Sequence, residues 1–137
     1  MEDFNTRNLL KTNFNYSGGY WYPLIGERAP ENCEYFDEDV FVKEYGLERL
    51  ILLIKKMECV EINEIAEDLK DRKIPVDDLY SYSGLEVIYC NDNVEWAIYF
   101  SHENTVTFLG TDFLQRLKND WPSWERYKNP WKLENIA

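Results

Sequence analysis

The chain has 137 residues, of which 45% are hydrophobic and 16% aromatic, and its formal net charge at pH 7 is −11. This length predicts a single domain, residues 1–137, built around one hydrophobic core, and the apolar content excludes a disordered chain. The acidic excess argues against direct binding of nucleic acid, because contacts to phosphates need a basic surface.

Membrane attachment, secretion and metal binding are not indicated either. No stretch approaches the roughly 18 apolar residues that cross a membrane, and the amino terminus lacks the pattern of a signal peptide. Cys33, Cys59 and Cys90 are far apart and match no disulfide or zinc-ligand spacing. We therefore expect a cytoplasmic protein with free thiols, no membrane partner, no metal and no cofactor. The sequence leaves the oligomeric state open.

Residues 1–30 are predicted to form an irregular arm. They are polar and end in a loop-like stretch that contains SGGYWYP, whose glycines loosen the chain. We expect Tyr20, Trp21 and Tyr22 to pin this arm to the body of the domain.

A helical pattern then covers residues 38–57. Asp37 is a suitable N-cap, and apolar residues follow at helical spacing. The turn from 50 to 54 is apolar on every side, which predicts burial on more than one side. Gly46 is expected to divide the segment into two helices.

Residues 59–65, CVEINEI, alternate apolar and polar side chains, which predicts a strand. A helix that continues through EIAEDLKD is the alternative that the pattern leaves open. Residues 66–84 contain Pro75 and Gly84 and are predicted to form a long connection.

The second half of the chain predicts an antiparallel meander over residues 85–109. Its strands are LEVIYC (85–90), VEWAIYF (94–100) and TVTFL (105–109), and the turns between them are short. Period two places Trp96, Ile98 and Phe100 on one face.

A short helix is expected over residues 111–121, with Thr111 as its N-cap. Its apolar residues Phe113, Leu114 and Leu117 share one face. The aromatic tail 122–137 is expected to pack on the body. The fold class is therefore α+β, with the helices on one face of the sheet.

The stretch Ser101-His102-Glu103 holds the chain's single histidine. We expect His102 to end the core-facing row of its strand and to hold the turn through a backbone carbonyl. Adjacent side chains point to opposite faces of a strand, which argues against a catalytic triad, and we assign no catalytic residue. The alternative is an enzyme or a small-molecule-binding protein with a pocket near His102, walled by Cys90, Tyr99 and Glu103.

Acidic residues concentrate in the middle of the chain. Residues 31–78 carry 15 acidic and 7 basic side chains, a net charge of −8. Such a surface is complementary to a basic protein, and tyrosine beside acid is typical of protein-binding surfaces. The predicted contact residues are Glu61, Glu64, Glu67, Asp68, Asp77, Asp78, Tyr80 and Tyr82.

Residues 80–124 also resemble a group of small bacterial proteins. The resemblance lies in Y-x-x-x-E-V-x-Y from Tyr82, in EWAIYFSHENTVTF-x-G from Glu95 and in WPSW from Trp121. Some proteins of that group are similar to immunity proteins of polymorphic toxin systems. The resemblance implies a non-catalytic, single-domain protein that covers the active site of a basic toxin domain, often a nuclease. Charge and resemblance together therefore predict an acidic protein-binding module.

Overall fold

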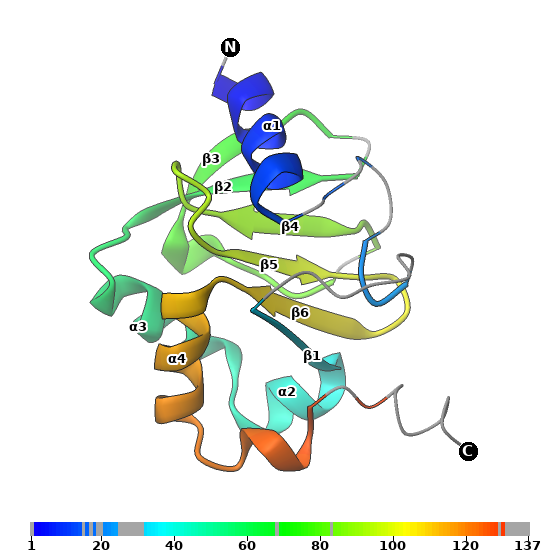
Figure 1. Cartoon of the computed structure of the whole chain (residues 1–137), viewed down its shortest axis with the longest axis vertical. Coiled ribbons are helices and arrows are strands. Elements are labelled where there is room, and N and C mark those ends of the chain that lie inside the picture. Colours follow the sequence, from blue (N-terminus) through cyan, green and yellow to red (C-terminus); the bar gives the residue numbers. More distant parts are fainter. Residues whose placement is uncertain are drawn as a thin grey trace.

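The computed structural model describes residues 2–14, 16, 18, 21–24, 32–67, 69–82, 84–128 and 130. It has an α+β fold in which helices pack on a six-stranded antiparallel sheet of order β1-β6-β5-β4-β2-β3 (Figure 1). The strands are β1 (Cys33–Asp37), β2 (Glu61–Ala66), β3 (Arg72–Pro75), β4 (Val87–Cys90), β5 (Ala97–Phe100) and β6 (Thr105–Leu109). The helices are α1 (Glu2–Phe14), α2 (Glu38–Glu44), α3 (Leu47–Lys56) and α4 (Thr111–Asp120), with the short 3-10 helices η1 (Val76–Asp78) and η2 (Trp124–Arg126).

The predicted meander is confirmed. Strands β4, β5 and β6 pair with their neighbours along the chain, so that Tyr99 lies between Ile88 on one side and Thr107 on the other. The predicted strand near 59–65 is also present as β2, which pairs with β4. The alternative helix through EIAEDLKD is wrong, because β2 continues to Ala66.

Two strands were not expected from the sequence. The first, β1, pairs with β6 and forms one edge of the sheet. The second, β3, forms the other edge beside β2, within the segment 66–84 that we expected to be a connection. Its sequence, RKIP, is short, begins with two charged residues and ends in proline, so it carries little strand signal.

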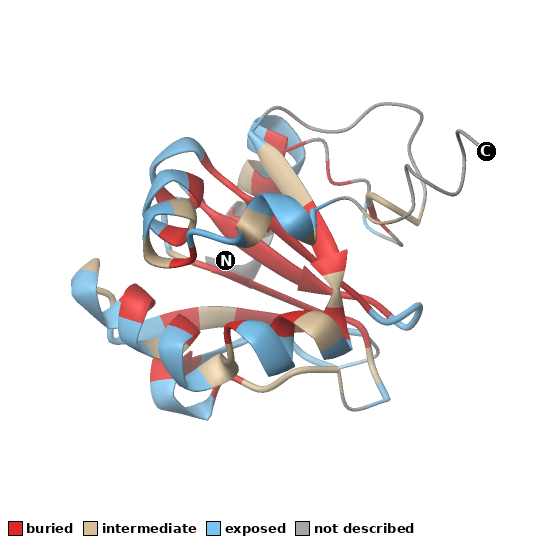
Figure 2. Cartoon of the chain, turned by 90° about the horizontal axis from the view of Figure 1, so that it is seen from below, coloured by how far each residue is buried: buried red, intermediate tan, exposed pale blue. Residues whose placement is uncertain are grey.

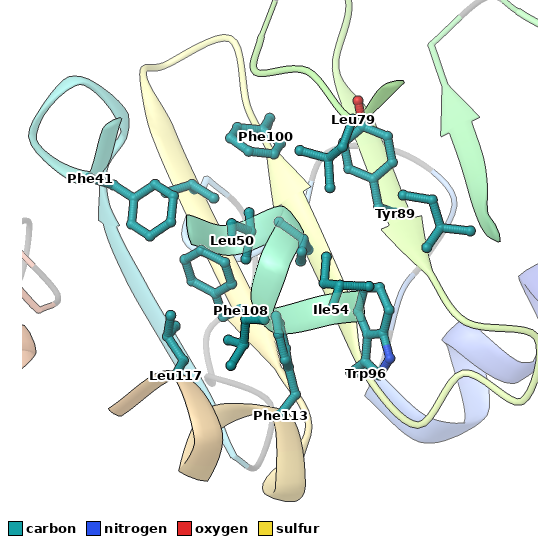
Figure 3. Close-up of a cluster of buried hydrophobic side chains, with 14 of the residues drawn as sticks. Phe41, Leu50, Ile54, Leu79, Tyr89, Trp96, Phe100, Phe108, Phe113 and Leu117 are labelled. Carbon is teal, nitrogen blue, oxygen red and sulfur yellow. The ribbon is translucent and has the colours of Figure 1, made fainter. Parts of the chain in front are cut away.

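One face of the sheet packs against α2, α3 and α4 (Figure 3). Trp96, Ile98 and Phe100 lie on this face, as the period-two pattern predicts. Asp37 caps α2 by accepting a hydrogen bond from the Val40 amide at 3.0 Å, and Gly46 separates α2 from α3. Both of these predictions are confirmed.

Helix α4 buries Phe113, Leu114 and Leu117 on the same face, as expected. Its N-cap, however, is Gly110 rather than Thr111. In α3, Leu52 is 56% exposed, so the prediction that this turn is buried on several sides is wrong for Leu52.

The second face of the sheet is covered by α1 and the segment around Trp21. Residues 2–14 are therefore helical, where an irregular arm was expected, and helices cover both faces rather than one. The helix places Leu10 and Phe14 one turn apart against the sheet. The Trp21 indole donates a hydrogen bond to the Phe14 carbonyl at 3.2 Å. Tyr20 lies outside the described residues.

Both faces of the central strands are thus buried (Figure 2). In the carboxy-terminal region, the Tyr127 ring stacks on Trp121 with centroids 5.8 Å apart, and Trp124 packs against the core. Trp131 lies outside the described residues.

Substitution Gly110→Ala should destabilise the protein by about 2–4 kcal/mol. Gly110 has φ of +115°, and a Cβ there would lie 2.5 Å from the Glu95 carbonyl oxygen. Gly84→Ala is the matched control, because Gly84 has φ of +110° but no atom within 4 Å of the added Cβ. Urea unfolding of the two variants measures the difference, and equal losses would contradict the packing argument.

Candidate functional site

A buried carboxylate organises the region around the single histidine. Glu86, which directly precedes β4, is 7% exposed. Its Oε2 accepts a hydrogen bond from the His102 amide at 3.1 Å and lies 2.5 Å from His102 Nδ1. Its Oε1 accepts a hydrogen bond from the Tyr99 hydroxyl at 2.5 Å. Glu86 therefore ties the β5–β6 hairpin to the start of β4.

Tyr99 extends this network into the second face of the sheet. Its hydroxyl accepts a hydrogen bond from the Trp21 amide at 3.3 Å. Burial, reinforced by the hydrogen bond to Glu86, raises the pKa of Tyr99. The tyrosine therefore stays protonated and donates to the carboxylate.

His102 differs from its prediction in two respects. Its Nδ1 contacts the Glu86 carboxylate rather than a backbone carbonyl. Through that carboxylate, His102 is linked to Tyr99 on the second face of the sheet, and it does not end the row that contains Phe100. The hairpin between β5 and β6 turns the chain before position 102, so the strand period no longer applies there. His102 still holds the hairpin in place, but its partner is the Glu86 side chain, which the period-two argument did not consider.

The other residues of the predicted pocket are dispersed. Cys90 pairs with Ala97, while Val87 pairs with Phe100, so Cys90 is about 10 Å further along the sheet from the hairpin. Burial raises the pKa of the Cys90 thiol to about 12. Glu103 is exposed, with its Oε1 3.6 Å from His102 Nε2. These side chains do not surround one pocket.

A cavity of about 300 Å³ lies nearby, between α1 and the ends of β2 and β4. Glu86 and Tyr99 contribute to its wall together with Arg7, Tyr16 and Glu67. Tyr99 is the residue that this cavity shares with the predicted pocket. No sequence pattern pointed to Arg7 or Tyr16, because both lie in the segment that was expected to be irregular.

The predicted contact residues fall into three environments. Glu61, Glu67, Asp77 and Asp78 are exposed, Tyr80 and Tyr82 are half-buried, and Glu64 is buried. Asp68 lies outside the described residues.

Glu64 belongs to an internal network rather than to a contact surface. It accepts hydrogen bonds from Arg72 at 2.6 Å and from the Tyr80 hydroxyl at 2.6 Å. Burial acts to raise the pKa of Glu64, but these two hydrogen bonds outweigh it and lower that pKa. The Tyr80 backbone is also held by the Tyr89 hydroxyl.

Exposed apolar and acidic side chains lie on the surface where α3 adjoins η1. Lys55 of α3 pairs with Asp77 at 2.6 Å, and the Val76 amide donates to the Val60 carbonyl at 2.9 Å. Leu52 lies one helical turn before Lys55, and Val60 is 70% exposed. We name this surface the acidic end; its residues are Leu52, Glu58, Val60, Glu61, Asp77 and Asp78.

A third buried carboxylate lies at the start of α2. Glu38 is 7% exposed, and its Oε1 has no hydrogen-bond partner among the described residues. Burial raises the pKa of Glu38 to about 7, the charge of Asp39 adds to this effect, and a backbone hydrogen bond from Tyr82 opposes it. The Glu38 amide donates to the Asn104 carbonyl, which anchors α2 on the hairpin that carries His102.

Within the part of the chain that the structure describes, no group of three or more His, Cys, Asp or Glu side chains is arranged to hold a metal ion. No described helix has the length and apolar character needed to cross a membrane.

Comparison with known proteins gives no match: no family model, no curated protein and no solved structure is significantly similar to the chain. The resemblance to immunity proteins therefore stays a prediction from the sequence.

Substitution His102→Ala should lower the free energy of unfolding by about 1–3 kcal/mol, because it leaves the buried Glu86 carboxylate without its ring partner. Glu103→Ala is the control and should change stability by less than about 0.5 kcal/mol, since Glu103 is exposed. Urea unfolding at neutral pH checks both values. An unchanged stability of His102→Ala would show that the Glu86 contact is not structural.

Substitution Glu38→Gln should remove a pH dependence of stability. The folded-state pKa of about 7 exceeds the ordinary value of 4.5, so stability from protonated Glu38 is complete below pH 4.5 and lost as pH rises through 7. The loss in the unsubstituted protein should be on the order of 1–3 kcal/mol. Urea unfolding from pH 5 to about 9 measures it, and identical pH profiles for both proteins would contradict the assignment.

Proposed function

We propose that this protein is a non-catalytic, acidic protein-binding module that binds a basic protein through the acidic end. The observation that carries the proposal is the position of Leu52 and Val60, two large apolar side chains that are 56% and 70% exposed beside Asp77, Asp78 and Glu61. An apolar centre with a charged rim is the usual anatomy of a protein interface.

Charge supports a basic partner. The acidic end carries Glu58, Glu61, Asp77 and Asp78, of which Asp77 is paired with Lys55, and the whole chain has a net charge of −11. Opposite charge accelerates encounter between two proteins, whereas buried apolar anchors hold the complex once it has formed. Salt should therefore slow association more than it speeds dissociation.

Two features of the sequence support a toxin domain as the partner. The resemblance of residues 80–124 to immunity proteins and the acidic charge both favour a basic toxin domain, whose active site this protein would cover. The non-catalytic part of the proposal is supported by the surroundings of two candidate nucleophiles, Cys90 and Ser101, which do not activate them. The Cys90 thiol has a raised pKa, and the Ser101 hydroxyl is hydrogen-bonded to the Thr105 hydroxyl at 2.6 Å.

The double substitution Leu52→Asp with Val60→Asp should weaken partner binding by at least about thirtyfold, the size expected for interface anchors. The matched control is Val42→Asp with Leu69→Asp, which places the same charges on two other exposed apolar positions. Tagged proteins serve as bait in lysate of the source cell. The unsubstituted protein and the control should each retain one stoichiometric basic protein through a high-salt wash.

The captured protein is then produced in a bacterial host. It should arrest growth, and co-production of the unsubstituted protein, but not of the double variant, should restore growth. Equal capture by both double variants would refute the acidic end as the contact. An acidic captured protein, or one that does not affect growth, would refute the immunity function.

A further inference from the structure

The cavity between α1 and the sheet has the chemistry of a small-ligand site. Its volume of about 300 Å³ lies at the lower end of the range for small-molecule pockets. Ile65 and Ile88 supply apolar wall, and two tyrosines and two carboxylates supply polar groups. The cavity shares no residue with the acidic end, so what it binds is independent of the proposed protein partner.

The positive charge of Arg7, which lines the cavity, is already neutralised by an ion pair. Arg7 binds Asp71 through two hydrogen bonds, from Nε and Nη2, each 2.7 Å long. Asp71 is almost fully buried, with 8% of its side chain exposed. The pair is therefore a bidentate ion pair with no net charge, and an anionic ligand would have to compete with Asp71 for Arg7.

Glu67 and Glu86 supply carboxylate acceptors to the cavity, and His102 contacts Glu86 through the other oxygen, Oε2. Glu86 Oε1 accepts one hydrogen bond, from Tyr99, and a carboxylate oxygen can accept two. Glu67 is exposed at the rim, where its Oε1 accepts a hydrogen bond from the Glu86 amide at 3.2 Å. A donor that enters the cavity therefore meets acceptors at the wall and at the rim.

Aromatic rings stand beside these carboxylates. Tyr16 and Tyr99 line the cavity, and Trp21 packs between them, with ring centroids 5.1 Å from Tyr16 and 5.8 Å from Tyr99. Burial raises the pKa of Tyr16, so its ring stays neutral and its hydroxyl protonated. The faces of neutral aromatic rings attract organic cations, and they do so most strongly where water is excluded.

We propose that this cavity binds a small organic cation, a primary ammonium or guanidinium group carried on an apolar body. The charged group would lie between the Glu86 and Glu67 carboxylates. The apolar body would lie against Ile65, Ile88 and the Tyr16 ring.

The test is a titration of the full chain with tyramine and with agmatine, followed by calorimetry and by backbone amide NMR. The matched probe is 3-(4-hydroxyphenyl)propionate, which has a similar body and a carboxylate in place of the amine. At least one amine should bind about tenfold or more tightly than the carboxylate. The amide signals that shift should be those of residues 7, 16, 65–67, 86–88 and 99.

Glu67→Gln should weaken amine binding at least about threefold, because it removes one of two charges at the site. Glu61→Gln, an equal change on the acidic end, should leave it unchanged. Glu86→Gln should weaken it further, and if that variant does not fold, Glu67→Gln decides. No binding of either amine at about 10 mM, equal binding of the carboxylate, or shifts confined to other residues would overturn the proposal.

Discussion

The structure depends on one constraint: the central strands of the sheet are buried on both faces. Val87, Tyr89, Ile98 and Phe100 pack against α2, α3 and α4, while Ile88, Cys90, Ala97 and Tyr99 pack against α1 and Trp21. A sheet with two apolar faces cannot leave either face in water. The amino-terminal segment is therefore a structural layer, and the cavity exists because this layer covers the second face.

Burial on both faces also explains the polar networks. Glu64 lies within β2 and Glu86 lies directly before β4, and both are buried beneath the covering layers. A buried carboxylate is tolerated when its oxygens are hydrogen-bonded, and Arg72 and Tyr80 serve Glu64 as Tyr99 and His102 serve Glu86. The single histidine is thus one of several side chains that satisfy acids enclosed by the fold.

Much of the fold could be predicted because its signals are local. The meander follows from β-rich runs with short turns, and the break between α2 and α3 follows from Gly46. Helix α1 could not be predicted, since it faces the sheet with few apolar side chains, such as Leu10 and Phe14, among polar ones. The edge strands β1 and β3 are short and acquire their structure by pairing with β6 and β2.

The candidate sites were less predictable than the fold. Cys90 was expected near His102 because it ends the strand next to the one that precedes His102, but strand register separates them. Eight acidic and tyrosine residues were grouped by proximity along the chain, and the sheet turned Glu64 inward while leaving Glu61 outside. The exposure of Leu52 and Val60 had no sequence signal, since apolar residues are expected inside.

The two faces of the sheet are covered by apolar clusters of unequal size, and this difference has a consequence for dynamics. The α2–α4 layer contributes a broad aromatic cluster, whereas α1 and the segment around Trp21 hold the other face through fewer apolar contacts. Elements with few buried contacts open at lower free energy than the rest of a protein. Helix α1 should therefore detach as a sub-global unit while the sheet and the other helices remain folded. Amide hydrogens of α1 would then exchange with solvent well before those of β5, and each such opening would remove the wall of the cavity to which Arg7 contributes.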